Sequence, residues 1–134
     1  MRIEHIAIWT PDLDRLRHFY TTYFGASAGP RYHNPRKNFS SYFLTFASGA
    51  RLEIMHRPDV TPTPNQNQTY YGYAHFALVV GDETAVDTLA HSLHQAGIPH
   101  LDGPRRTGDG YYEALFLDPD GNKIEIMAHR NYDP

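Results

Sequence analysis

The chain has 134 residues, of which 40% are hydrophobic and 13% aromatic, enough to bury a core in one compact domain or in two half-domains. Its formal net charge is −3 and no basic stripe occurs, which argues against nucleic acid as a partner. The absence of cysteine excludes disulfides, a thiol nucleophile and thiolate ligands, so any metal site must use imidazole and carboxylate groups.

The first half of the chain reads as a strand, a helix and then further strands. Apolar residues alternate along the first segment, and Asp12 is a helix N-cap followed by apolar positions at helical spacing. Gly25 is placed to end that helix, since glycine readily adopts the left-handed conformation of a C-terminal cap. The predicted strands are residues 3–9, 41–47 and 51–57, the last two forming a hairpin, and residues 26–39 are irregular with room for one short strand.

Residues 58–72 are rich in proline and polar residues and read as a linker. The second half then repeats the order of the first, with a helix that follows Asp82 and stops at Gly97. The predicted strands are residues 74–80, 111–117 and 123–128, with a loop at residues 103–110, a tight turn at residues 118–121 and a polar, loosely held tail at residues 129–134.

No apolar run approaches the roughly 20 residues needed to cross a bilayer. The chain starts on a strand pattern, and no apolar signal segment comes before it. We therefore expect a cytoplasmic protein with no membrane partner.

One motif occurs twice and organises the rest of the sequence. A basic residue, an apolar residue, Glu, Ile and Met follow one another around Glu53 and again around Glu125. Each motif lies downstream of an apolar run with one His near its start: His5 lies 48 positions before Glu53, and His75 lies 50 positions before Glu125. The chain therefore contains two copies of one βαβββ module. We expect a single domain over residues 1–134, composed of a module at 1–57, the linker at 58–72 and a module at 73–129.

The repeated His and Glu residues are the best candidates for chemistry. Strand alternation points Glu53 and Glu125 away from their large apolar neighbours, and it does the same for His5 and His75. Converging in one cleft, the four side chains would suit Zn²⁺, Ni²⁺, Co²⁺, Mn²⁺ or Fe²⁺, and the residue set does not choose among these ions. Taken singly, such residues are more often structural or solvent-facing, but their repetition at matching offsets favours a shared site.

Other candidate residues carry weaker patterns. Trp9 lies on the histidine face of the first strand and either lines an apolar pocket or packs in the core. Arg57 lies on the glutamate face of its strand and either binds an anionic group or stays a solvent-exposed charge. Arg105 and Arg106 lie in the glycine-flanked loop, where a basic side chain could close over a ligand. Residues 118–122 favour a hairpin turn over a calcium loop, because the glycine falls at the wrong position. Six further histidines show no paired spacing and read as surface or structural residues: His18, His33, His56, His91, His94 and His100.

Taken together, these motifs resemble the glyoxalase, bleomycin resistance and extradiol dioxygenase group, the vicinal oxygen chelate superfamily. The resemblance implies an α+β fold in which paired βαβββ modules form an open, U-shaped eight-stranded barrel around a metal, and it implies a homodimer. It is carried by residues 3–7, Phe19-Tyr20 ahead of Phe24-Gly25, residues 52–54, residues 74–77, and Asp118-Pro119-Asp120-Gly121 followed by Ile124-Glu125.

Within that group the pattern is most similar to the glyoxalase I lyases. Their metal ligands correspond to His5, Glu53, His75 and Glu125, and the last of these is implied as the catalytic base. The implied reaction converts the hemithioacetal of a 2-oxoaldehyde and a thiol into a thioester through a metal-bound enediolate. The implied cofactor is one divalent ion per site, with Zn²⁺ or Ni²⁺ favoured over Co²⁺, Mn²⁺ and Fe²⁺.

One departure from the glyoxalase I pattern concerns substrate recognition. Glutathione-using members carry Arg and Asn where this chain has Trp9 and Arg57, so the thiol or oxo compound is left open. Trp9, Arg57 and Arg106 are the predicted substrate-binding residues. Two alternatives remain: an extradiol-type dioxygenase, and a metal-free protein that sequesters an aromatic compound. The sequence also leaves open whether the ligands meet within one chain or between two.

Overall fold

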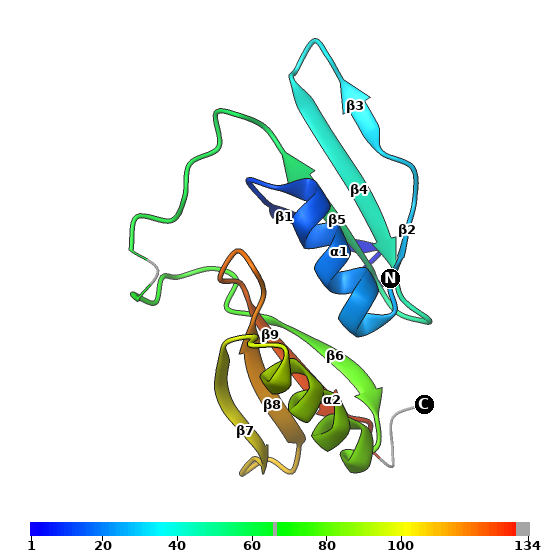
Figure 1. The fold of residues 1–134 in the computed structure, drawn as a ribbon, viewed down its shortest axis with the longest axis vertical. Helices are drawn as coiled ribbons and strands as arrows, with labels where there is room; N and C mark the ends of the chain where they lie inside the picture. Colours follow the sequence, from blue (N-terminus) through cyan, green and yellow to red (C-terminus); the bar gives the residue numbers. More distant parts are fainter. Residues whose placement is uncertain (66, 131–134) are drawn as a thin grey trace. The chain divides into compact units, whose positions relative to one another are not determined.

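The computed structural model describes residues 1–65 and 67–130, which fold into two compact units with a boundary between Pro64 and Asn65 (Figure 1). In each unit one helix packs on one face of a sheet. The mixed α+β class predicted from the sequence is confirmed. The prediction that both modules form a single domain stays a prediction.

The first unit contains one helix and a sheet whose strands run in the order β1-β5-β4-β2, with β3 also paired to β4. Strand β1 is parallel to β5, while β4 is antiparallel to β5, β2 and β3. The elements are β1 His5–Trp9, α1 Leu13–Phe24, β2 Ser27–Ala28, β3 Tyr32–Asn34, β4 Phe39–Thr45 and β5 Arg51–His56.

The second unit repeats this arrangement, with strands in the order β6-β9-β8-β7. Strand β6 is parallel to β9, as β1 is to β5, and the other pairs are antiparallel. The predicted βαβββ order is thus confirmed in both units, and the first sheet gains one strand because β2 and β3 are separate. The elements are β6 Phe76–Gly81, α2 Glu83–Gln95, β7 His100–Arg106, β8 Tyr112–Leu117 and β9 Lys123–Ala128.

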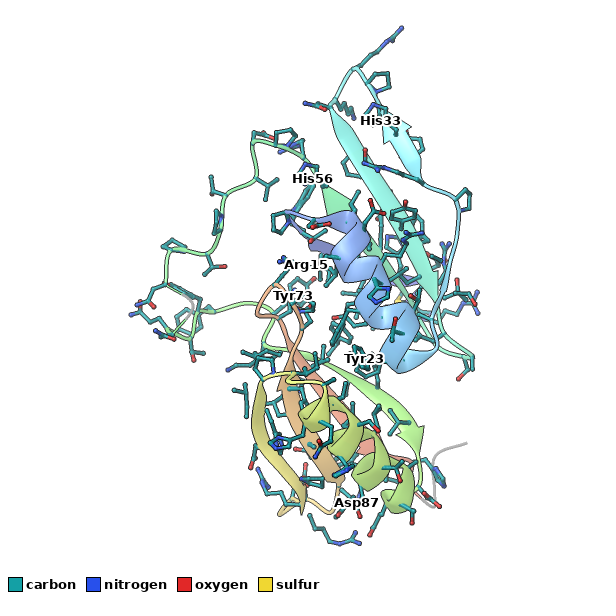
Figure 2. All side chains as sticks on the ribbon, in the orientation of Figure 1. Arg15, Tyr23, His33, His56, Tyr73 and Asp87 are labelled. Carbon is teal, nitrogen blue, oxygen red and sulfur yellow. The ribbon has the colours of Figure 1, made fainter. Side chains whose placement is uncertain are left out.

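The helices begin and end where the sequence predicts. The Asp12 carboxylate accepts a hydrogen bond from the backbone N–H of Arg15, which is labelled in Figure 2, and Asp82 does the same for Ala85. Gly25 has φ of 63°, the left-handed cap conformation that an L side chain rarely adopts. These caps satisfy backbone groups that the ends of a helix leave unpaired.

Burial divides each sheet into two faces. Ile54 in β5 and Ile126 in β9 are fully buried on the face that carries the helix, together with residues such as Leu16 of α1 and Leu93 of α2. Since successive side chains of a strand alternate, Glu53 and Glu125 must lie on the opposite face. The sheet-and-helix core therefore fixes the direction of both glutamates.

The predicted loop at residues 103–110 is wrong over its first part, because β7 continues to Arg106. Gly103 has φ of 76°, and a Cβ there would lie 2.4 Å from the carbonyl oxygen of Glu113 in β8. Only glycine permits this approach, so here the Gly-Pro pair accompanies an irregular, bulged strand instead of a loop.

Other boundaries differ by a few residues. The first strand begins at His5 instead of residue 3, and β6 begins at Phe76, so His75 directly precedes it. The predicted linker at 58–72 has no helix or strand among its described residues, which exclude residue 66. Positions 131–134 of the predicted tail lie outside the described residues. No helix in the described part of the chain is long and apolar enough to cross a membrane.

Truncating a side chain in the core between helix and sheet should lower the free energy of unfolding. Leu93 of α2 is fully buried, so Leu93→Ala should lower the free energy of unfolding by about 2–5 kcal/mol through lost burial and a residual cavity. Gln95→Ala on the exposed side of the same helix should change it by less than about 0.5 kcal/mol. Urea denaturation of both variants measures the difference, and equal effects would contradict this assignment of faces.

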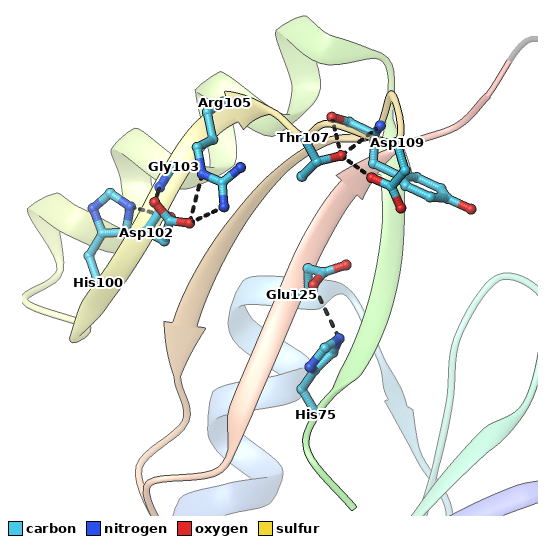
Figure 3. Close-up of polar contacts among 9 residues, drawn as sticks. His75, His100, Asp102, Gly103, Arg105, Thr107, Asp109 and Glu125 are labelled. Carbon is cyan, nitrogen blue, oxygen red and sulfur yellow. Dashed lines mark hydrogen bonds and ion pairs between the residues drawn. The ribbon is translucent and has the colours of Figure 1, made fainter. Parts of the chain in front are cut away.

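Asp102 in β7 predicts an acid dependence of stability. Its carboxylate accepts hydrogen bonds from Arg105 and from the backbone N–H of Gly103 (Figure 3). These bonds, that from Arg105 foremost, hold the pKa of Asp102 below its ordinary value of 3.8. Because the folded-state pKa is the lower one, the stabilisation is present above the ordinary value and is lost as the pH falls through the folded-state pKa.

The Asp102→Asn variant should therefore unfold at lower urea concentration than wild type near neutral pH, with the difference shrinking as the solution is acidified. Introduced into Arg105→Gln, the same change should have a smaller effect, because the main partner is already gone. Parallel curves for Asp102→Asn and wild type across the acid range would refute the assignment.

Candidate functional site

The first unit brings His5 and Glu53 together. Strands β1 and β5 run parallel with Ala7 directly opposite Glu53, and His5 lies two residues before Ala7 on the same face. The Nε2 atom of His5 is 3.7 Å from Oε2 of Glu53. The Glu53 side chain is 15% exposed and that of His5 is 40% exposed, so the pair is open to solvent mainly on the histidine side.

The second unit brings His75 and Glu125 together in the same way. Ala77 lies directly opposite Glu125 across the parallel β6 and β9 strands. The Nε2 atom of His75 points at Glu125 Oε2 from 3.2 Å (Figure 3). Both units thus place a small alanine opposite the glutamate and a histidine two residues earlier, which leaves room for the imidazole beside the carboxylate.

The spacing within each pair fits two ligands of one divalent ion. Zinc binds histidine nitrogen and carboxylate oxygen at about 2.0–2.2 Å, which puts neighbouring donors of a tetrahedral or octahedral site roughly 3.0–3.5 Å apart. The second pair, at 3.2 Å, is within that range, and the first, at 3.7 Å, is slightly wider. Within residues 1–65 and 67–130 no three His, Asp or Glu side chains form a group that could hold a metal, so each pair needs further donors.

In the first unit a neighbouring carboxylate orients the histidine. Glu4 Oε2 lies 2.5 Å from Nδ1 of His5, and Glu4 Oε1 accepts a hydrogen bond from Nε of Arg51 at 2.8 Å. The hydrogen bond with His5, followed by that with Arg51, lowers the pKa of Glu4. A carboxylate on Nδ1 leaves Nε2 directed at Glu53, the arrangement commonly found behind metal-binding histidines.

In the second unit the structure adds a residue that the sequence reasoning missed, Glu113 of β8. Glu113 pairs with Met127, two residues from Glu125, so both glutamates share one face. Burial, together with the negative charge and hydrogen bonding of Glu125, raises the pKa of Glu113, and Arg105 opposes the rise. The alternation of Glu113 with the buried Ala114 could have revealed this face from the sequence.

The predicted substrate-binding residues do not all lie on the sheet face that carries the His–Glu pairs. The Arg57 guanidinium lies over the Trp9 ring at 5.4 Å from its centroid. Arg106 instead pairs with Glu83 at the start of α2 and lies over Tyr112 at 5.9 Å. Arg106 is therefore directed to the helix side of its sheet, whereas Arg105 pairs in register with Glu113.

Several of the remaining histidines make structural contacts, as predicted. His33 hydrogen-bonds to Ser40 Oγ at 2.8 Å, and His56 to the backbone oxygen of Thr10 at 3.0 Å; both histidines are labelled in Figure 2. His100 stacks on Phe116 with ring centroids 4.5 Å apart. None of these contacts involves a second metal-type donor.

The Asp118 segment is a turn, also as predicted. The Asp118 carboxylate accepts hydrogen bonds from the backbone N–H groups of Asp120 and Asn122, both at 2.9 Å. These bonds hold the connection between β8 and β9, so the carboxylate serves the hairpin and a calcium loop is not formed.

The fold and these pairs define a class of protein: an α+β chain of two βαβββ modules, each presenting one His and one Glu on the sheet face opposite its helix. The model of the Glyoxalase/Bleomycin resistance protein/Dioxygenase superfamily matches residues 2–126, and the chain belongs to that superfamily.

The relatives of this chain lie at low identity. The metallothiol transferase FosB of Lysinibacillus sphaericus is 28% identical over 92% of this chain and 79% of the relative. A probable lactoylglutathione lyase of Vibrio cholerae is 27% identical over 96% of this chain and 91% of the relative. Among solved structures, the trypanothione-dependent glyoxalase I of Leishmania major matches with a TM-score of 0.76 and 27% identity, covering 96% of this chain and 86% of that chain.

The two pairs predict a metal-binding pattern. Glu53→Gln and Glu125→Gln keep the side-chain size but remove a charged donor, and each should weaken Zn²⁺ or Ni²⁺ binding by more than about a hundredfold. Glu4→Gln, which loosens only the orientation of His5, should weaken it by about 10–100-fold. Competition against a fluorescent chelator measures each affinity.

The matched control is Glu83→Gln, which removes a carboxylate paired with Arg106 on the helix side. This variant should bind metal like wild type. If Glu53→Gln or Glu125→Gln does so too, the pairs are not ligands.

Proposed function

We propose that this protein is a metal-dependent lyase of the glyoxalase I type, acting on the adduct of a thiol and a small 2-oxo compound. The observation that carries the proposal is the repeated His–Glu pair, at 3.7 Å in one unit and 3.2 Å in the other. We further propose that His5, Glu53, His75 and Glu125 together hold one Zn²⁺ or Ni²⁺ ion, within one chain or across a homodimer.

The bound ion would supply positive charge beside the substrate oxygens and so stabilise negative charge that develops there. The chain supplies the rest of the chemistry. Glu125 removes the proton from the carbon that bears the sulfur, next to the carbonyl. It then returns that proton to the former carbonyl carbon. Its position in β9, with 13% of the side chain exposed, limits the water that could intercept that proton. His5 is held by Glu4, which keeps one imidazole nitrogen aimed into the site.

The three relatives support thiol chemistry, since each is named for a thiol or a thiol compound. The three names refer to different thiols. In this chain, Trp9 and Arg57 occupy the positions where glutathione-using lyases carry Arg and Asn, which favours a thiol other than glutathione. A small molecule as substrate, a homodimer and a cytoplasmic location belong to the same proposal.

A second candidate is metal-dependent transfer of a thiol to an electrophile, favoured by the similarity to the metallothiol transferase. Thiol transfer needs an activated electrophile but no base for a carbon-bound proton. The two reactions therefore differ in their need for Glu125 and in their products. The lyase converts the hemithioacetal into a thioester, whereas the transferase joins the thiol to the electrophile as a thioether.

The lyase is tested with methylglyoxal or phenylglyoxal and a panel of thiols at saturating Ni²⁺ or Zn²⁺, following thioester formation by ultraviolet absorbance. Glu125→Gln should lower kcat/KM by about 100–10,000-fold, the usual contribution of a general base. Metal content measured on the same samples separates loss of the base from loss of the ion.

Glu83→Gln again serves as the control and should keep wild-type activity. A metal-loaded wild-type protein that forms no thioester with any thiol would refute the lyase. With an alkylating electrophile in place of the glyoxal, metal-dependent consumption of the thiol above the uncatalysed rate would establish the transferase in its place.

A further inference from the structure

A cluster of exposed aromatic rings lies on the His5 face of the first unit. Trp9 of β1 is 40% exposed and Tyr32 of β3 is 55% exposed. Both contact Phe39 of β4, with ring centroids 6.2 Å and 6.1 Å from it. We call Trp9, Tyr32, Phe39 and Arg57 the aromatic patch. Contiguous exposed apolar groups of this kind mark binding surfaces more often than isolated ones do.

The strand register places this patch beside the His5–Glu53 pair. Trp9 is opposite Met55, Met55 is opposite Ser41, and Ser41 is opposite Tyr32, so one row crosses four strands. Met55 is two residues beyond Glu53 in β5. The row is therefore about 7 Å from Glu53 along the strand, and Arg57 is about 13 Å from Glu53.

Arg57 adds a directed positive charge to the patch. Its Nε donates a hydrogen bond to Asp59 at 2.5 Å while the guanidinium lies over the Trp9 ring. Among residues 1–65 and 67–130 the Arg57 side chain makes no other hydrogen bond or ion pair, which leaves its terminal amino groups as donors. A guanidinium that is held over an aromatic ring and has donors to spare is well suited to a carboxylate.

We propose that the aromatic patch binds an aromatic carboxylate, with the ring against Trp9 and Phe39 and the carboxylate on Arg57. Resting on the proposed function, this group is the non-reacting end of the substrate or of its thiol, whose reacting atoms lie at the His5–Glu53 pair. The chain thus selects an aryl acid with the two residues that stand where glutathione-using members carry Arg and Asn.

The chain contains a built-in reporter for this binding, since Trp9 is its only tryptophan. Phenylacetate should change the Trp9 fluorescence of the metal-free protein in a saturable way. Benzyl alcohol, which keeps the ring and lacks the charge, should bind at least about tenfold more weakly, and so should acetate, which lacks the ring. Glutathione should not compete.

Two substitutions should act in opposite directions. Arg57→Gln should weaken phenylacetate binding by about tenfold, whereas Asp59→Asn should strengthen it severalfold by removing the carboxylate that competes for Arg57. Phe39→Leu, measured together with circular dichroism to confirm folding, should weaken it without abolishing the Trp9 signal.

Arg17→Gln is the matched control. Arg17 pairs with Asp14 and lies over Tyr42 at 5.0 Å, and its side chain is 42% exposed, as is that of Arg57. Arg17 belongs to α1, however, on the helix side of the sheet. Arg17→Gln should bind phenylacetate like wild type.

The proposal is overturned if phenylacetate leaves Trp9 fluorescence unchanged up to millimolar concentration, if benzyl alcohol binds equally well, or if Arg57→Gln and Arg17→Gln behave alike. Because these measurements need neither metal nor turnover, their failure is distinct from failure of the lyase. Binding that survives in a protein without lyase activity would sustain the patch and remove only its place in that reaction.

Discussion

Everything proposed for this chain depends on the parallel pairing of the first and last strand of each unit. That pairing puts Ala7 opposite Glu53 and Ala77 opposite Glu125, and it brings a histidine beside each glutamate. The helix between the paired strands must cover one face of the sheet, where it buries the aliphatic neighbours of both glutamates. The polar pairs are thereby confined to the other face. A shift of one residue in either register would turn the glutamate into the core, so the core and the site specify the same pairing.

The two pairs share a geometry but not their surroundings. His5 is held from behind by Glu4, which Arg51 holds in turn, so the first pair belongs to a chain of charged contacts at the edge of its sheet. The second pair has a further carboxylate instead: burial and the charge of Glu125 raise the pKa of Glu113. Two carboxylates this close attract a cation more strongly than one does, and a cation would relieve their repulsion.

Much of this architecture could be predicted from the sequence, because hydrophobic periodicity, the capping residues Asp12 and Asp82, and the repeated motif all specify the same βαβββ order. The loop predicted at residues 103–110 was wrong over its first part because Gly103 and its proline are typical of loops, and the close approach of the Glu113 carbonyl that requires glycine is a tertiary contact. The direction of Arg106 was missed for a related reason. Which side of a strand a residue occupies follows from pairing register, and bulges in β7 shift that register.

The two copies agree at the positions proposed for metal binding and differ at those proposed for recognition. Both units keep the histidine and the glutamate, yet four residues beyond them the first unit has Trp9 and Arg57, whereas the second has Val79 and His129. To hold one ion between the copies, as proposed, each copy supplies the same donors, one histidine and one glutamate. A substrate with a distinct non-reacting end requires different side chains in the two copies, and at these two positions the first copy has a large aromatic ring with a guanidinium over it. Because both units repeat the parallel pair of strands, changing side chains at one position beyond the His–Glu pair would alter the proposed specificity without disturbing that pairing.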